Sequence, residues 1–94
     1  MEVQPRRYAS LTPDSRRRLR AEYAEAQGWA CLHCKASLLG QPSPEVQRKR
    51  VTAKLFPKNF FDHPVHLHHD HKTGMTLGAV HARCNAVRAI RDLP

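Results

Sequence analysis

The sequence predicts a small α+β domain that carries an N-terminal helix and is stapled by a zinc ion. Three observations favour this class. The chain has only 94 residues, a size at which a thin core often needs a metal in addition to packing. All three cysteines lie in two short-spaced groups of zinc-ligand type. The last third of the chain has short apolar runs around a turn, followed by a helical pattern. No repeat divides the chain, so residues 1–94 are expected to form one domain.

The charge balance favours a polyanionic partner, most simply nucleic acid. Lys and Arg number 16 against 8 Asp and Glu, which gives a net charge of +8 and a pI near 10.1. An odd number of cysteines, with two in a Cys-x-x-Cys, favours metal ligation in a reducing compartment over a disulfide framework. The chain has neither a signal-peptide pattern nor an apolar run of membrane-spanning length. We therefore expect a cytoplasmic protein with no membrane partner.

The N-terminal part is expected to be a flexible basic arm, residues 1–10, followed by a helix over residues 12–27. Thr12 is a good N-cap, Pro13 suits the first helical position, and Gly28 is a common terminator. The helix carries four arginines, for which phosphate contact is favoured over a merely solvated face. They are Arg16, Arg17, Arg18 and Arg20.

Residues 29–91 are expected to hold the zinc-stapled core. Glycine and prolines predict a loop at residues 37–44. The following stretch, residues 45–55, is equally compatible with a short helix and with a strand. It contains a second basic cluster, which is Arg48, Lys49 and Arg50.

A hairpin and a helix are predicted for the last third of the chain. Strands are expected from residue 65 to about 67 and over residues 76–80, with the turn near residues 72–74. A helix should then run from Ala82 to about Asp92, with apolar residues on one face.

Four side chains have the types and spacing of a structural zinc site: Cys31, Cys34, His81 and Cys84. Thiolate and imidazole suit Zn²⁺ better than hard cations, and four protein ligands leave no position for water. We therefore expect the metal to act in folding, where structural zinc contributes on the order of 10–16 kcal/mol of apparent binding energy. His33 and His63 are alternatives for the fourth ligand, but His81 is better placed and His33 is interpreted as a bystander.

An ordered set of motifs runs through the last third of the chain: His68-His69-Asp70-His71, Thr73-Gly74, Gly78 and His81-x-x-Cys84-Asn85. This set resembles the HNH (His-Me finger) endonucleases. Its closest likeness is to the phage recombination endonuclease VII branch, which has Asp-His-Asp-His, Thr-Gly, Gly and Cys-x-x-Cys-Asn in this order. That branch also has a Cys-x-x-Cys pair upstream. The resemblance covers about residues 29–91 and is specific because the spacing from residue 73 to 85 fits without a gap.

The resemblance implies a ββα-metal fold and metal-dependent hydrolysis of phosphodiester bonds in DNA, by nicking or cutting. It places His69 as the general base that activates water, and His68 and Asn85 as ligands of a catalytic divalent metal. It places the Cys3His set at the structural zinc positions. A phage-encoded protein would act in the cytoplasm of a bacterial host, and monomer and homodimer both remain open.

Two positions depart from the family pattern. His81 stands where the family has a cysteine, which still suits zinc. His68 stands where an aspartate is frequent, and imidazole is a softer ligand than carboxylate. Mn²⁺, Ni²⁺ or Co²⁺ are therefore expected to support activity as well as Mg²⁺.

The implied pairing of His68 and His69 in one cleft conflicts with regular strand geometry, because neighbours point to opposite faces. We therefore expect both histidines at a strand end or in an irregular stretch. His66 and His71 are the natural rivals for these two positions, and His66 is interpreted as a surface or packing histidine. Asp70 and His71 are interpreted as supporting or turn residues.

Arg83 and Arg88 are expected to contact DNA nearer the site than the other basic residues. The main rival interpretation is a catalytically inert, zinc-stabilised nucleic-acid-binding module. A third interpretation is a protein-interaction domain whose basic face binds an acidic partner.

Overall fold

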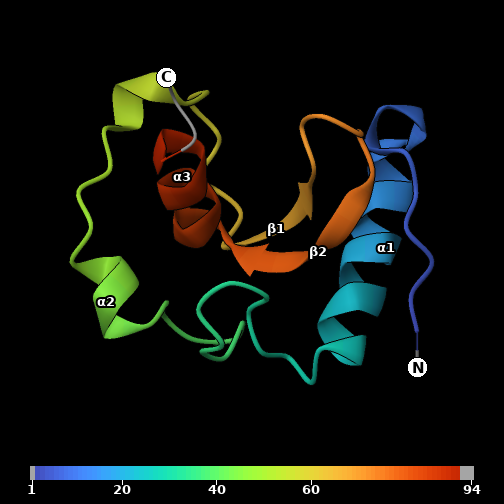
Figure 1. The fold of residues 1–94 in the computed structure, drawn as a ribbon, viewed down its shortest axis with the longest axis horizontal. Coiled ribbons are helices and arrows are strands. Elements are labelled where there is room, and N and C mark those ends of the chain that lie inside the picture. Colours follow the sequence, from blue (N-terminus) through green and yellow to red (C-terminus); the bar gives the residue numbers. More distant parts are fainter. Residues whose placement is uncertain (1, 92–94) are drawn as a thin grey trace.

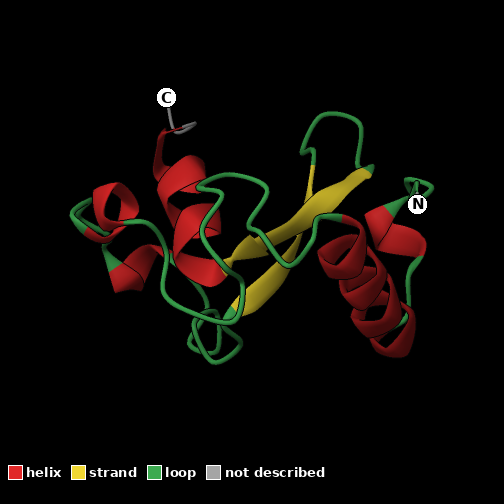
Figure 2. Cartoon of the chain, turned by 90° about the horizontal axis from the view of Figure 1, so that it is seen from below, coloured by secondary structure: helices red, strands yellow, loops and turns green. Residues whose placement is uncertain are grey.

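The computed structural model describes residues 2–91. A two-stranded antiparallel hairpin, β1 (Val65–His69) and β2 (Thr76–His81), lies between two helices (Figures 1 and 2). Helix α1 (Pro13–Ala26) lies beside one end of the hairpin and helix α3 (Ala82–Arg91) beside the other. The expectation of a small α+β fold is confirmed at this level.

Helix α1 begins and ends where its sequence signals predict. The Thr12 side chain accepts a hydrogen bond from the Ser15 N–H at 3.1 Å, and Pro13 is the first helical residue. Gly28, with φ of +66°, follows the helix in the left-handed conformation that ends many helices. The helix buries Leu19, Tyr23 and Ala24 against the hairpin side of the molecule.

The middle of the chain contains only short elements in its described part. Residues Pro44–Gln47 form the single-turn helix α2, and Ala53–Leu55 a 3₁₀ turn. The open choice between helix and strand for residues 45–55 is thus decided for a short helix. Tyr8–Ser10 forms another 3₁₀ turn near the N-terminus.

The hairpin is longer than predicted and is irregular at one point. β1 continues to His69, and β2 continues to His81. His68 pairs with Gly78 but His69 pairs with Thr76, so one residue of β2 has no partner and the register shifts. This is a β-bulge, a feature that re-aims side chains at the end of a strand. Helix α3 starts at Ala82 as predicted, while Asp92 lies outside the described residues.

The basic arm, which was expected to be flexible, makes backbone hydrogen bonds to the hairpin. The Arg6 N–H donates to the Thr76 hydroxyl at 2.9 Å, and the Thr76 N–H donates to the Arg6 carbonyl at 2.8 Å. The Tyr8 N–H donates to the Gly74 carbonyl at 2.9 Å. The outer edge of β2 offers backbone groups that need partners, and the arm provides them.

A glutamine side chain covers the rest of that edge. Gln27 accepts the Ala79 N–H at 2.8 Å and donates back to the Ala79 carbonyl at 2.9 Å. This approach leaves no room beside Gly78, where a Cβ atom would lie 2.6 Å from the Gln27 Oε1 and 2.9 Å from a methyl of Leu32. Glycine is therefore required at position 78, because the side chains of Gln27 and Leu32 occupy the space that a Cβ atom would need.

Gly78→Ala should lower the free energy of unfolding by about 1–3 kcal/mol, because the added methyl displaces the Gln27 amide from its two backbone partners. Urea denaturation followed by circular dichroism measures the change. Gly40→Ala is the matched control, since its Cβ would meet nothing closer than the Ser37 carbonyl at 4.0 Å. Equal midpoints for the two variants would show that the Gln27 contact contributes nothing.

The core is small and lies where α1, the hairpin and the first cysteine pair meet. Two of its buried members, Cys31 and Cys84, belong to the predicted zinc set. The remaining buried members are Leu11, Leu19, Tyr23, Ala24, Leu38, Leu67, Ala79 and Val80. Within the described part of the chain, no helix has the length and apolar character needed to cross a membrane.

Candidate metal centre and histidine cleft

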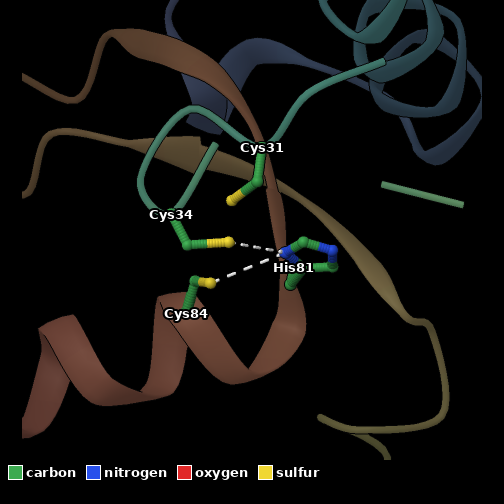
Figure 3. A group of neighbouring side chains, drawn as sticks. All are labelled: Cys31, Cys34, His81 and Cys84. Carbon is green, nitrogen blue, oxygen red and sulfur yellow. Dashed lines mark hydrogen bonds between the residues drawn. The ribbon is translucent and has the colours of Figure 1, made fainter. Parts of the chain in front are cut away.

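The four predicted zinc ligands come together from three parts of the chain. Cys31 and Cys34 lie on one turn, His81 at the end of β2 and Cys84 in the first turn of α3 (Figure 3). Their ligand atoms all lie within 4.8 Å of one another. These four residues can hold a metal ion, as the sequence predicts.

The distances in this cluster fit a tetrahedral site. The His81 Nδ1 lies 3.4 Å from the Cys34 Sγ and 3.6 Å from the Cys84 Sγ. Tetrahedral zinc with bonds of ordinary length would separate nitrogen and sulfur by about 3.6 Å. The cluster is therefore consistent with structural zinc.

The His81 tautomer also suits metal binding. Its Nε2 lies 2.8 Å from the Ser37 carbonyl, which can only accept, so Nε2 carries the proton and Nδ1 is free to bind a metal. The Cys84 thiol, acting with backbone N–H groups of Cys34 and His81, lowers the pKa of Cys31. A low thiol pKa favours the thiolate, which is the form that ligates metals.

The alternative ligands are not part of this cluster. His63 is exposed, and His33 is outside the group that can share an ion. His33 instead packs edge-on against His68, with ring centroids 4.8 Å apart. Its Nε2 is buried and has no hydrogen-bond partner in the described structure, and burial lowers its pKa to about 4. His33 is therefore outside the metal cluster, as expected, and it contacts His68 of the neighbouring histidine site.

An open cleft of about 590 Å³ lies between the hairpin end and α3. It is lined by His68, His69, Asp70, His71, Lys72, Leu77, Asn85, Arg88 and Ala89. The three residues expected at a catalytic site therefore border one cavity. His69 is the last residue of β1, and the hairpin register shifts between His68 and His69, so both residues border the cleft at an irregular strand end. The expectation of an irregular strand end is confirmed.

A chain of hydrogen bonds orients Asn85. The His66 Nε2 donates to the Phe60 carbonyl at 2.7 Å, so its Nδ1 is an acceptor and receives the Asn85 amide N–H at 3.2 Å. The amide oxygen of Asn85 must then face the His68 Nδ1, which lies 3.1 Å away. His66 is thus packed against Phe60, as a packing histidine should be, but it also sets the direction of Asn85.

Asp70 builds the turn that follows the histidines. Its carboxylate accepts the N–H groups of Lys72 at 2.7 Å and Thr73 at 3.0 Å. Its carbonyl accepts the N–H of Gly74, whose φ of +75° is the left-handed conformation that glycine tolerates. Asp70 is therefore a turn residue, one of the two roles foreseen for it.

His69 has a partner that sequence reasoning missed. The Tyr8 ring stacks on the His69 imidazole, with centroids 4.0 Å apart and planes inclined by 16°. Burial, together with the nearby His71 and His68, lowers the pKa of His69, so its imidazole is neutral at pH 7. The only sequence signal for this contact is an aromatic residue within the basic arm.

The arginines of α1 do not form one free cluster. Asp14 pairs with Arg17 and also lies 3.3 Å from Arg18. Arg16 donates to the Leu11 carbonyl at 3.3 Å and lies over the Tyr8 ring. Asp14 therefore offsets one positive charge of the helix, and the contacts of Arg16 with Leu11 and Tyr8 limit how freely its guanidinium can reach a phosphate.

Arg83 and Arg88 have different positions, although both were expected near the site. Arg83 donates to the carbonyls of Val46, Gln47 and Lys49, at distances between 2.7 and 3.5 Å. It thereby fastens the α2 segment to α3 and does not line the histidine cleft. Arg88 is exposed and does line the cleft. The difference follows from their positions on α3, five residues apart and on different faces.

The metal centre and the cleft share the start of α3. Cys84 and Asn85 are consecutive residues, so an ion bound by Cys84 would also hold the turn that carries Asn85. No family model matches the sequence, and no curated protein or solved structure is significantly similar to it. Its function must therefore be inferred from the chemistry of these two sites.

Proposed function

We propose that the protein is a metal-dependent endonuclease of the HNH (His-Me finger) type, which hydrolyses phosphodiester bonds in DNA. The observation that carries the proposal is that His68, His69 and Asn85 line one open cleft beside a Cys3His centre. The hairpin followed directly by α3 is compatible with a ββα-metal arrangement. An inert binding module has no need to direct these three polar groups into one cavity.

The pair formed by His68 and Asn85 suits a divalent cation. Adjacent ligands of an octahedral ion with 2.0–2.1 Å bonds are separated by about 3.0 Å, and the His68 Nδ1 and Asn85 Oδ1 are 3.1 Å apart. Metal binding at the His68 Nδ1 would require the neutral tautomer that carries its single proton on Nε2. Burial lowers the pKa of His68, which favours the neutral ring over imidazolium. A bound cation would supply charge stabilisation for the phosphate and the leaving oxygen.

His69 suits the role of general base. Its neutral imidazole lies at the cleft wall and can accept the proton of a water molecule that attacks phosphorus. His69 is the last residue of β1, and the Asp70 turn directly after it limits how far the backbone can shift. These features support attack on a phosphate held beside His68 and Asn85.

The remaining free cations suit contact with the DNA backbone. Arg88 borders the cleft, and Arg48, Lys49 and Arg50 are all exposed. Cations of this kind bind phosphates without reading sequence, so binding should weaken as salt rises. Of these four cations, Arg88 is the one that borders the cleft, so it is expected to lie nearest the reacting phosphate.

A supercoiled-plasmid cleavage assay with a panel of divalent metals tests the proposal. The zinc-loaded protein should convert plasmid to nicked or linear DNA with Mn²⁺ or Ni²⁺ as well as with Mg²⁺, because imidazole is a softer ligand than carboxylate. Reactions with EDTA provide the control. Activity restricted to Mg²⁺ would contradict His68 as a direct ligand.

Two other outcomes would support different functions. Plasmid binding without cleavage under every metal would favour the inert nucleic-acid-binding module, which the net charge of +8 and the Cys3His centre also suit. Absence of binding even at low salt would favour an acidic protein partner for the basic surface.

A further inference from the structure

The N-terminal arm contacts His69, a residue of the cleft, through the aromatic ring of Tyr8. We propose that Tyr8 is a positioning residue for His69, so that the arm is part of the reactive site. The inference rests on the proposed function, because it assigns a role to the base of that reaction. It starts from the nearly parallel stacking of the two rings at 4.0 Å.

Contacts on several sides hold Tyr8 in place. Its N–H donates to Gly74, its carbonyl accepts the Leu11 N–H at 3.1 Å, and the preceding Arg7 forms a β-bridge with Met75. The Arg16 guanidinium lies 5.4 Å from the ring centroid, a distance suited to a cation–π contact. Tyr8 is therefore attached both to the turn that follows His69 and to α1.

The His69 ring lacks the hydrogen-bond restraint that the His66 and His68 rings have. The rings of His66 and His68 are each oriented by a hydrogen bond, whereas none involves the His69 ring within residues 2–91. The torsion that turns an imidazole has a broad energy profile, so an unrestrained ring samples many directions. The neighbouring His71 ring is farther away, at 5.1 Å, and is tilted by 46°. Of these two ring–ring contacts, the stack on Tyr8 is the closer and the more nearly parallel, so it restricts rotation of the His69 ring more.

The ring of Tyr8, and not its hydroxyl, makes this contact. The hydroxyl forms no hydrogen bond within the described residues, so phenylalanine should replace tyrosine without loss. Alanine removes the stacking surface and leaves the arm's backbone bonds intact. Comparing Tyr8→Ala with Tyr8→Phe thus separates the effect of the ring on the position of His69 from the effect of the backbone bonds that attach the arm.

The experiment compares the full-length wild type with Tyr8→Phe, Tyr8→Ala, His69→Ala and the Tyr8→Ala/His69→Ala double variant in the plasmid assay. Tyr8→Ala should lower kcat by roughly 10- to 100-fold with KM unchanged, since misplacing a reacting group by about 1 Å can cost that much. Tyr8→Phe should retain wild-type kcat. In the His69→Ala background, Tyr8→Ala should have no further effect.

Each contrary result has a distinct meaning. Wild-type cleavage by Tyr8→Ala, or an equal further loss in the His69→Ala background, would overturn the inference. Absence of cleavage by the wild type would overturn the proposed function instead. If the wild type does not cleave, NMR still tests the stacking contact. The Tyr8 ring current should shift the His69 ring protons upfield, and Tyr8→Ala should abolish that shift. Unmoved His69 signals would overturn the inference whatever the activity.

Discussion

Removing the metal from the Cys3His centre should unfold the protein at neutral pH. Structural zinc contributes on the order of 10–16 kcal/mol of apparent binding energy, whereas whole domains are stable by only about 5–15 kcal/mol. The core here is small, and Cys31 and Cys84 are among its buried residues. Elemental analysis should give one zinc per chain, and titration with a strong chelator should abolish the helical circular-dichroism signal.

Single substitutions in the centre provide the sharper test. Cys31→Ser should prevent folding, because it removes a fully buried metal ligand. This ligand lies in the turn that follows α1 and that is hydrogen-bonded to β2 through the Leu32 N–H. His81→Cys should still bind zinc, since four thiolates also form a normal structural site. His63→Ala is the control, an exposed histidine outside the cluster. A zinc-free chain with native circular dichroism would contradict a structural role for the metal.

Replacing the base should abolish most cleavage while leaving the fold intact. His69→Ala should lower kcat by about 10²- to 10⁴-fold, the usual contribution of a general base. His69 is outside the Cys3His group and lies at the open cleft, so zinc content and thermal stability should not change. Steady-state plasmid cleavage with the best metal of the panel measures the effect.

The control for this variant is again His63→Ala, which should cleave as the wild type does. DNA binding by His69→Ala, measured at the same salt concentration, should match the wild type because a neutral imidazole contributes no charge to phosphate contact. Equal cleavage by His69→Ala and the wild type would remove His69 from the mechanism. The reactive role would then have to lie with another histidine of the cleft.

Local signals predicted much of the fold. The Thr12 cap and Gly28 placed α1 within one residue of its ends, and the turn near residues 72–74 placed the hairpin. The ligand set was also predictable, because Cys-x-x-Cys and His-x-x-Cys each bring two ligands together without help from the rest of the chain. Local spacing does not bring the two pairs of ligands together; that depends on the tertiary fold.

Contacts between distant segments were not predictable from such signals. Arg6 and Thr76 are separated by 70 positions, and nothing near either residue indicates that they pair. The contacts of Arg83 were not predictable for the same reason. A basic residue on an exposed helix face suggests phosphate contact, but three backbone carbonyls of the α2 segment occupy its guanidinium.

The sequence by itself determined the chemistry of this protein: the zinc-type ligands, the histidines beside an asparagine, and the excess of positive charge. These are properties of residue type and short spacing, which do not depend on the rest of the fold. Only the tertiary structure decided how that chemistry is directed. His68 and His69 border one cleft at the irregular end of β1, His66 turns the Asn85 oxygen toward His68, and the arm places Tyr8 on His69. Each of these arrangements depends on contacts between side chains or backbone groups that no local sequence pattern encodes.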